Sequence, residues 1–173
     1  MEIIVRQEKA GDETQIRNVI ISAFMREEEA RLVENLRRRS EWKDAISLVA
    51  VLEKDIVGHI LFFPVKIKQS SGGEKQSLCL APVSVRHDLQ GRGIGSALIK
   101  EGVSDARRLG CESINVVGSE NYYPRFGFLP AVNFGIRCSI AGMPEKNFMI
   151  LELKKGSLAA GGIVIYPSEF NGV

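Results

Sequence analysis

The segment from Gln90 to Gly95 carries three glycines between an expected strand and an expected helix. Glycines at positions 91, 93 and 95 let the backbone approach a bound group without obstruction by Cβ atoms. The unpaired N–H groups of a first helical turn, with the positive end of the helix dipole, then favour negative charge. Arg92 adds a charged contact. This chemistry suits a pyrophosphate, although a glycine-rich turn without a ligand has the same pattern.

Two familiar phosphate loops do not fit this segment. A Walker loop ends in Gly-Lys-Ser/Thr, whereas Gly95 is followed by Ser96 and Ala97. The dinucleotide fingerprint GxGxxG would need a third glycine at position 96, and it usually opens the first strand–helix unit of a chain. This loop lies in mid-chain, which does not fit the dinucleotide fingerprint, and the missing Walker lysine disfavours a nucleotide-phosphate enzyme.

Other side chains with reactive chemistry are few. The only histidines are His59 and His87, and the cysteines Cys79, Cys111 and Cys138 are widely spaced with no CxxC. We therefore expect no metal site and no disulfide framework. The cysteines are interpreted as small buried residues in a reducing compartment. His59 has an apolar strand context that is typical of a core histidine.

The elements that must position the loop follow from hydrophobic periodicity. Asp12 and Gln15 resemble a capping box at the start of a helix, and Pro82 predicts a bulge or an open edge within its strand. The basic run Arg37–Arg39 is interpreted as a solvated helix end. Strands are expected over residues 2–7, 47–52, 56–67, 77–85, 113–117, 134–140, 148–153 and 163–166, helices over 12–24, 27–38 and 93–109, and helical turns over 121–126.

Length and composition indicate one domain over residues 1–173, of mixed α+β architecture around one sheet. With 23 basic and 21 acidic residues, the net charge of +2 gives no reason to expect nucleic acid or a membrane surface as a partner. The most apolar stretch, residues 57–65, is far short of the ~20 residues that cross a bilayer. The N-terminus lacks the pattern of a signal peptide, so we expect a cytoplasmic protein.

Two segments carry a resemblance to a known family. Residues 82–95 closely resemble motif A of the GCN5-related N-acetyltransferases (GNAT), whose pattern [RQ]-x-x-G-x-[GA] is met by Gln90, Gly93 and Gly95. Residues 121–128 look like the Tyr-x-x-x-Gly-Phe element of that family, with Tyr123 at the tyrosine position. Flanking segments resemble the YhbS-like branch of predicted N-acetyltransferases, so the resemblance covers most of the chain.

The resemblance implies the GNAT fold: a single central, mostly antiparallel sheet, flanked by helices, with a V-shaped splay between its fourth and fifth strands. Acetyl-CoA would lie in the gap between the strand ending at Val85 and the strand ending at Val117. The pantetheine amides would pair with the backbone of the first strand, and the pyrophosphate would rest on the glycine loop. The cofactor-binding residues expected on this basis are Val83, Val85, Gln90, Gly91, Arg92, Gly93, Ile94, Gly95 and Ser96.

The resemblance also implies a reaction, in which an amine attacks the thioester directly in a ternary complex. Tyr123 matches the family's general acid, which protonates the CoA thiolate; the alternative is that it only packs against the cofactor. Tyr122 is interpreted as a packing or substrate-side residue, an assignment that depends on the register of the turn. The base is unassigned, since Glu27–Glu29 fit an acidic helix start as well as a cleft.

The acceptor is not readable from the sequence. It could be the amine of a small molecule or of a protein, and a non-catalytic acetyl-CoA sensor is the alternative function. We expect the acceptor pocket to form from residues 24–36, the strand over residues 57–65 and the C-terminal strands. The tail Gly161–Val173 is expected to be exposed and is a candidate edge for a homodimer.

Overall fold

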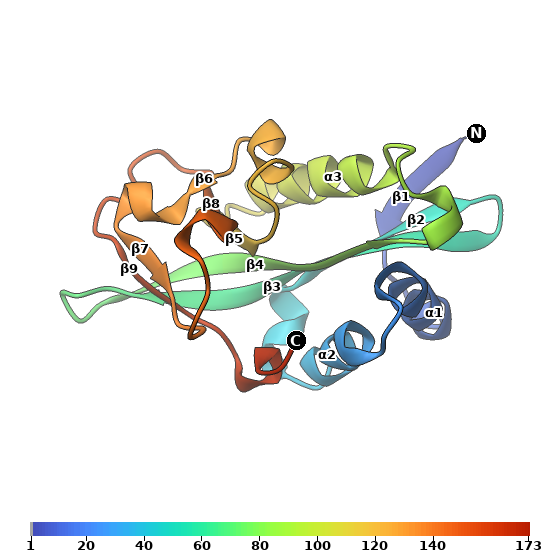
Figure 1. The fold of residues 1–173 in the computed structure, drawn as a ribbon, viewed down its shortest axis with the longest axis horizontal. Helices are drawn as coiled ribbons and strands as arrows, with labels where there is room; N and C mark the ends of the chain where they lie inside the picture. Colours follow the sequence, from blue (N-terminus) through green and yellow to red (C-terminus); the bar gives the residue numbers. More distant parts are fainter. Residues whose placement is uncertain (1) are drawn as a thin grey trace.

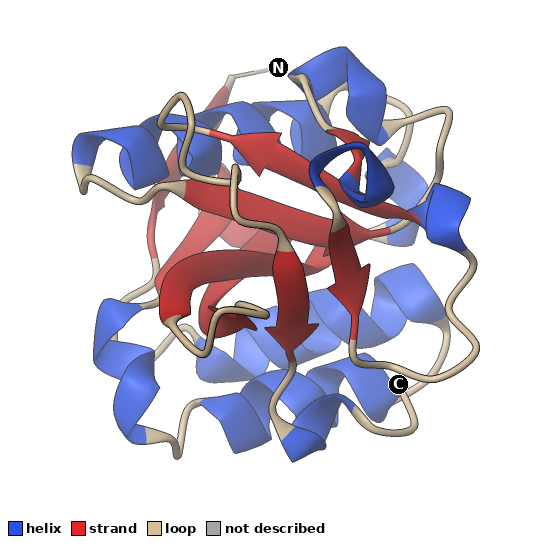
Figure 2. Cartoon of the chain, turned by 90° about the vertical axis from the view of Figure 1, so that its left-hand side faces the viewer, coloured by secondary structure: helices blue, strands red, loops and turns tan. Residues whose placement is uncertain are grey.

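The structure is a computed structural model that describes residues 2–173. Helices lie on both sides of one central sheet (Figures 1 and 2). The α-helices are α1 (Glu13–Phe24), α2 (Glu28–Leu36) and α3 (Ile94–Arg108). The strands are β1 (Ile3–Gln7), β2 (Ile46–Leu52), β3 (Asp55–Lys68), β4 (Glu74–Val85), β5 (Ser113–Val117), β6 (Leu129–Pro130), β7 (Ile136–Cys138), β8 (Phe148–Glu152) and β9 (Gly162–Ile165).

The sheet has the strand order β1-β2-β3-β4-β5-β8-β6, and β9 pairs with both β3 and β7. All its ladders are antiparallel except β4–β5 and β7–β9. The predicted mixed α+β fold with a mostly antiparallel sheet is confirmed. Short 3-10 turns complete the chain: η1 (Ser40–Asp44), η2 (His87–Leu89), η3 (Tyr123–Phe126), η4 (Ala131–Phe134), η5 (Glu145–Asn147) and η6 (Ser168–Phe170).

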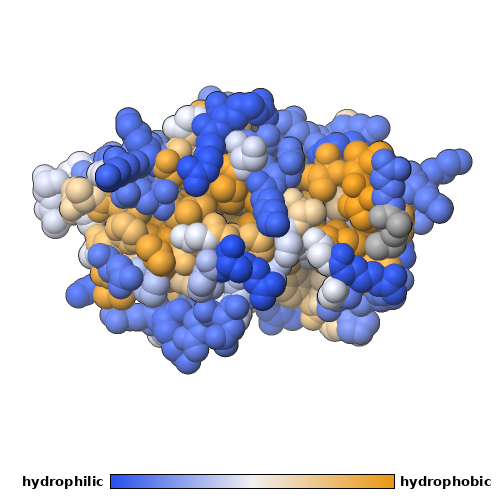
Figure 3. All heavy atoms as spheres, turned by 90° about the horizontal axis from the view of Figure 1, so that it is seen from above, coloured by the Kyte–Doolittle hydropathy of each residue, from blue (hydrophilic) through white to orange (hydrophobic). Residues whose placement is uncertain are grey.

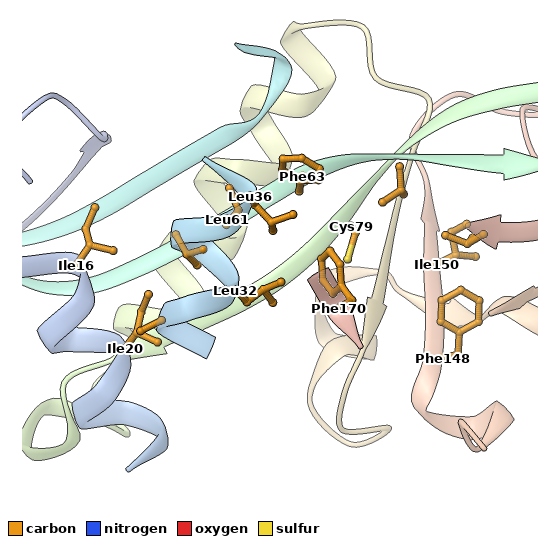
Figure 4. Packing of buried hydrophobic residues seen from close by; sticks show 14 of the residues in the cluster. Ile16, Ile20, Leu32, Leu36, Leu61, Phe63, Cys79, Phe148, Ile150 and Phe170 are labelled. Atoms are coloured by element: carbon orange, nitrogen blue, oxygen red, sulfur yellow. The ribbon is translucent and has the colours of Figure 1, made fainter. Parts of the chain in front are cut away.

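The sheet has a hydrophobic core on each face because side chains alternate along its strands. In β2, Leu48 packs in the cluster beneath α3, whereas its neighbour Val49 packs in the cluster beneath α1 and α2. Figure 4 shows the cluster beneath α1 and α2, in which side chains of these two helices meet those of β3, β4 and β8. The central strands are therefore covered on both faces.

Seen from the α3 side, the surface shows apolar patches between charged side chains (Figure 3). No helix within residues 2–173 is both long enough and apolar enough to span a bilayer.

The predicted capping box at Asp12 is wrong. The Asp12 carboxylate accepts hydrogen bonds from Arg6, at 2.6 and 3.1 Å, and from the backbone N–H of Lys9, at 2.9 Å, and it does not cap α1. Arg6 offers the carboxylate a positive charge and two donors in a bidentate pair, so it captures the carboxylate in place of the helix N-terminus. The same pair lowers the pKa of Asp12 below its ordinary value.

The interpretation of Arg37–Arg39 as a solvated helix end is also wrong for two of its members. Arg37 donates to Glu8 at 3.0 Å, and its side chain is only 18% exposed. Arg39 donates to Glu41 at 2.9 Å and to Glu169 at 3.1 Å. These pairs tie the end of α2 to the residue after β1 and to η6.

The C-terminal tail is not the exposed segment expected from the sequence. β9 forms an antiparallel ladder with the end of β3, from Ile163 opposite Lys68 to Ile165 opposite Lys66. Phe170 in η6 is buried against α2 and β4 in the larger core cluster (Figure 4). The tail is thus part of the domain, and the homodimer stays a prediction.

His59 lies within β3 and is fully buried, as its apolar context predicts. Its Nε2 lies 3.0 Å from the Ser47 hydroxyl, whereas its Nδ1 has no hydrogen-bond partner among the described residues. Burial, and secondly the charge of Arg37, lowers the pKa of His59 to about 3. Glu8 lies 3.9 Å away, but Arg37 already pairs with its carboxylate.

This burial predicts a pH dependence of stability. An unfolded histidine has a pKa of about 6.5, so below that pH the unfolded chain binds a proton that the folded chain excludes. The contribution of the neutral His59 to the free energy of unfolding is complete above pH 6.5 and is lost as the pH falls toward 3. From pH 6.5 to pH 5 the loss is about 2 kcal/mol. Denaturant unfolding of His59→Gln should lack this slope, and the control His87→Gln should retain it. Equal slopes in wild type and His59→Gln would contradict the prediction.

Candidate active site

The sheet opens between β4 and β5. The two strands pair in parallel only where Leu78–Leu80 lie opposite Ile114–Val116. β4 then continues to Val85 without a partner on that side, while it stays paired with β3 on the other. The splay predicted between the fourth and fifth strands is confirmed.

A bulge in β4 begins the divergence. Leu80 lies opposite Phe62 and Val83 opposite Ile60, so two residues, Ala81 and Pro82, face the single residue Leu61. The extra residue bends its strand and increases the local twist. The irregularity predicted at Pro82 is therefore present, and it lies at the position where β4 leaves β5.

The glycine loop lies at the end of this open strand. Gly91 and Gly93 have φ values of 74° and 83°, in the left-handed region that glycine adopts without strain. The buried side chains of Leu89 and Ile94 anchor the loop on both sides. No described residue accepts a hydrogen bond from the backbone N–H groups of residues 91–96. Six consecutive N–H donors thus surround the N-terminus of α3, a helix of 15 residues. The free donors and the positive end of the helix dipole together form a site that favours an anion.

Two polar side chains of the loop have different surroundings. The Gln90 amide donates to the carbonyl of Val85 at 3.1 Å, so it fixes the loop against the end of β4. Arg92 is exposed and forms no ion pair with any described residue, whereas Arg86 is paired with Asp88 at 2.7 Å. Arg92 is therefore the basic side chain of this loop that stays available to an anion.

The two tyrosines of the downstream motif point to different places. The Tyr122 hydroxyl lies 3.4 Å from that of Ser96, in the first turn of α3, and its ring stacks with the Arg125 guanidinium. Tyr123 is buried and lines a cavity on the other side, and no described residue hydrogen bonds to its hydroxyl. Burial raises the pKa of Tyr123 above its ordinary value, so its phenol keeps its proton at neutral pH.

The cavity lies beside the opening between β4 and β5 and has a volume of about 330 Å³. It is within the size range of small-molecule sites, about 300–1,000 Å³. Val83 and Val117 line it from the two diverging strands. Figure 4 shows three further lining residues from separate elements, Leu32 of α2, Cys79 of β4 and Phe170 of η6. Distant parts of the chain thus enclose one space next to Tyr123.

A buried polar chain stiffens the wall of this cavity. Tyr166 donates to Asn115 Oδ1 at 2.5 Å, and the Asn115 amide donates to the carbonyl of Leu78 at 3.0 Å and to the Ser77 hydroxyl at 3.2 Å. Ser113 in turn donates to Ser77 at 2.8 Å. Every hydrogen-bonding atom of the Asn115 side chain has a partner, so this residue ties β4, β5 and the segment after β9 together.

The charged side chains that line the cavity are Arg26 and Glu29. Arg26 Nε lies 3.0 Å from each carboxylate oxygen of Glu29. The side chain of Glu29 is 6% exposed and that of Arg26 is 53% exposed. The carboxylate therefore belongs to the interior and the guanidinium to the rim. Within residues 2–173, no group of three or more His, Cys, Asp or Glu side chains is placed to hold a metal ion.

The sequence locates only part of the cavity. The contribution of residues 24–36 is present, but the strand over residues 57–65 does not line the cavity, because β4 lies between β3 and the gap. The expected contribution of the C-terminal strands is present at Tyr166, whereas Cys79 and Phe170 were missed as lining residues. The polar Asn115 within the apolar run Ser113–Val117 was the available signal, since a buried amide needs partners from neighbouring elements.

Comparison with known proteins agrees with this geometry. Residues 14–128 match the model of the acetyltransferase (GNAT) family. The Escherichia coli K12 protein YjhQ, described as an uncharacterized N-acetyltransferase, is 39% identical over 120 residues, which are 69% of this chain and 66% of that protein. The chain belongs to the GNAT acetyltransferase family, as its two motifs indicate.

Two solved structures share the whole fold. A GNAT family N-acetyltransferase of E. coli, YhbS in complex with CoA, superposes with a TM-score of 0.88 at 27% identity, covering 99% of this chain and 93% of that one. A GNAT family acetyltransferase of Brucella melitensis in complex with acetyl-CoA superposes with a TM-score of 0.78 at 32% identity, covering 98% and 99%. The predicted resemblance to the YhbS-like branch is confirmed.

The position of Tyr123 depends on a glycine, which can be tested. A Cβ atom on Gly118 would lie 2.3 Å from Cε2 of Tyr123, so Gly118→Ala should displace the ring. Overpacking of this kind costs about 1–3 kcal/mol of unfolding free energy. In a Tyr123→Ala background the same substitution should cost little, because the clashing ring is absent. A thermodynamic cycle of the two variants measures this coupling. Additive effects would show that Gly118 does not hold Tyr123 in place.

Proposed function

We propose that this chain is an N-acetyltransferase that transfers the acetyl group of acetyl-CoA to a primary amine. The observation that carries the proposal is the juxtaposition of two sites. An array of free N–H groups over residues 91–96 lies beyond the end of the open edge of β4. A cavity lined by Tyr123 lies where this edge begins. The family and the ligands of the relatives, CoA and acetyl-CoA, support it.

The donor would be bound by backbone groups for most of its length. The pyrophosphate would accept hydrogen bonds from the N–H groups of residues 91–96, and Arg92 would add a charge contact. The pantetheine amides would pair with the unpartnered edge of β4 at Val83 and Val85, as an added strand does. The thioester would then reach the cavity beside Tyr123.

The reaction would be a direct transfer. A deprotonated amine attacks the thioester carbonyl carbon, the C–N bond forms, the C–S bond breaks, and the CoA sulfur leaves as a thiolate. Tyr123 would give its proton to that thiolate, the attacking nitrogen would release one proton to solvent as the amide forms, and Tyr123 would regain a proton from solvent. The protein would contribute chiefly by aligning amine and thioester.

A non-catalytic acetyl-CoA sensor is the other function that the sequence leaves open. The structure gives no reason to prefer it, since Tyr123 lines a cavity that a sensor does not need. The cytoplasmic location stays a prediction.

The donor site can be tested with glycine variants. Gly93→Ala forces a side chain into a left-handed backbone conformation (φ 83°) and should disturb the array of N–H groups. We expect acetyl-CoA affinity, measured by calorimetry, to fall about tenfold or more, equivalent to at least about 1.4 kcal/mol. Gly72→Ala is the matched control, with a φ of 92° and open space around it in the β3–β4 hairpin.

Both variants should lose similar stability, but only Gly93→Ala should lose acetyl-CoA binding. In a thermal-shift comparison of the wild type, acetyl-CoA should stabilise the protein more than ATP or NAD does. Stabilisation by a nucleotide alone would overturn the donor assignment.

The role of Tyr123 can be separated from donor binding. Tyr123→Phe keeps the ring and removes the proton, so kcat should fall 10- to 1,000-fold while acetyl-CoA affinity changes less than threefold, as expected for loss of a general acid. Tyr122→Phe removes a hydroxyl that faces Ser96 and is the control, with a smaller effect on kcat. CoA-thiol release measures both. An unchanged kcat in Tyr123→Phe would exclude Tyr123 as the acid.

A further inference from the structure

We propose that the acceptor is a small amine with a single positive charge on an apolar body of aromatic size, and that Glu29 recognises its ammonium group. This inference rests on the proposed function and names the class of its acceptor. It draws on the shape of the cavity, the nature of its lining and the placement of its one ion pair.

The lining of the cavity is mostly apolar, although Arg26 and Glu29 also contribute to it. Four aromatic rings contribute to it, from Phe24, Tyr123, Tyr166 and Phe170. Aromatic rings in such a wall favour a partner ring in edge-to-face or offset contact. With the acetyl end of the donor between Val83 and Val117, the remaining space extends toward Phe24 and Phe170. That space suits an apolar group better than a polar or branched sugar, whose hydroxyls would be buried without partners.

The charge of the cavity is set by Arg26 and Glu29. The Glu29 carboxylate is buried, and both of its oxygens receive hydrogen bonds from Arg26. A carboxylate has about four acceptor positions, and Arg26 is the one described residue that hydrogen bonds to this carboxylate, which lines the cavity. The ion pair is neutral in sum, and an entering ammonium therefore meets one partly compensated carboxylate.

The single ion pair favours amines with one positive charge over amines with several. One ammonium can bind at Glu29 and release its proton to solvent before attack. A second ammonium on the same molecule would find no second Asp or Glu side chain among the lining residues, and desolvation of an unpaired charge is costly. Diamines, polyamines and aminoglycosides should therefore be poor acceptors, although each carries primary amines.

A panel of amines at saturating acetyl-CoA, followed by CoA-thiol release, tests this acceptor class. Phenethylamine should exceed n-propylamine in catalytic efficiency (kcat/KM) at least tenfold, because it adds the ring. The kcat/KM for phenethylamine should also exceed those for putrescine and spermidine at least tenfold, because these two amines carry additional positive charge. A lysine-containing peptide should also have a lower kcat/KM than phenethylamine. Preference for putrescine, spermidine or the peptide would overturn the proposal.

Variants of the ion pair give a second test. Glu29→Gln keeps the size of the side chain and removes its charge, so the Michaelis constant for phenethylamine should rise about tenfold while inhibition by the neutral phenethyl alcohol stays within twofold. A merely structural role would weaken both ligands. Glu28→Gln, on the exposed side of the same helical turn, is the control and should change neither.

Arg26→Gln gives a gain that a folding defect cannot produce. Removing the compensating guanidinium leaves the cavity with a net negative charge, so the catalytic efficiency with putrescine should rise at least threefold relative to wild type. No rise would contradict the charge argument. If no amine on the panel is acetylated, the acceptor proposal fails. Acetyl-CoA binding by calorimetry then shows separately whether the proposed donor site survives.

Discussion

The parting of β4 from β5 is the constraint on which the rest of the structure depends. Their parallel ladder is three residue pairs long, and it ends where Ala81 and Pro82 bulge opposite Leu61. Unpaired backbone groups inside a protein are costly, so an open edge at the centre of a sheet needs a replacement partner. The open edge of β4 leads to the free N–H groups that follow Gln90. A chain-like ligand with amides in the middle and phosphates at one end satisfies both needs at once.

The opening also connects the two hydrophobic layers. Elsewhere the sheet separates the cluster beneath α3 from the cluster beneath α1 and α2. Tyr123 packs in the cluster beneath α3. It nevertheless lines the cavity together with Leu32 and Phe170, which belong to the cluster beneath α1 and α2. A donor that enters along the gap can therefore present its thioester to an acceptor held on the opposite face. The bulge in one strand thus determines where donor and acceptor can meet.

The sequence predicts the donor side of this arrangement better than the acceptor side. The glycine loop, α3 and Tyr123 are local patterns, because their geometry depends on neighbours within a few residues. The cavity brings Leu32, Cys79 and Phe170 together from distant parts of the chain, and no local pattern encodes that contact. The wrong expectation for Arg39 has the same cause, because its partner Glu169 is 130 residues away. Asp12 differs, since its partner Arg6 is near in sequence but belongs to the neighbouring strand β1 and not to the helix pattern.

Asn115 explains how so short a ladder can hold a cavity open. An apolar residue at this position of β5 would pack against its neighbours but could not fix the distance between the strands. The Asn115 amide instead bonds to Leu78 and Ser77 of β4, and its oxygen accepts the Tyr166 hydroxyl from the segment after β9. Hydrogen bonds between buried groups are directional, and leaving one unmade costs about 1–3 kcal/mol, so collapse of the wall would be resisted. The space that we propose for the acceptor is therefore preformed, and an apolar substrate would not have to order the wall in order to bind.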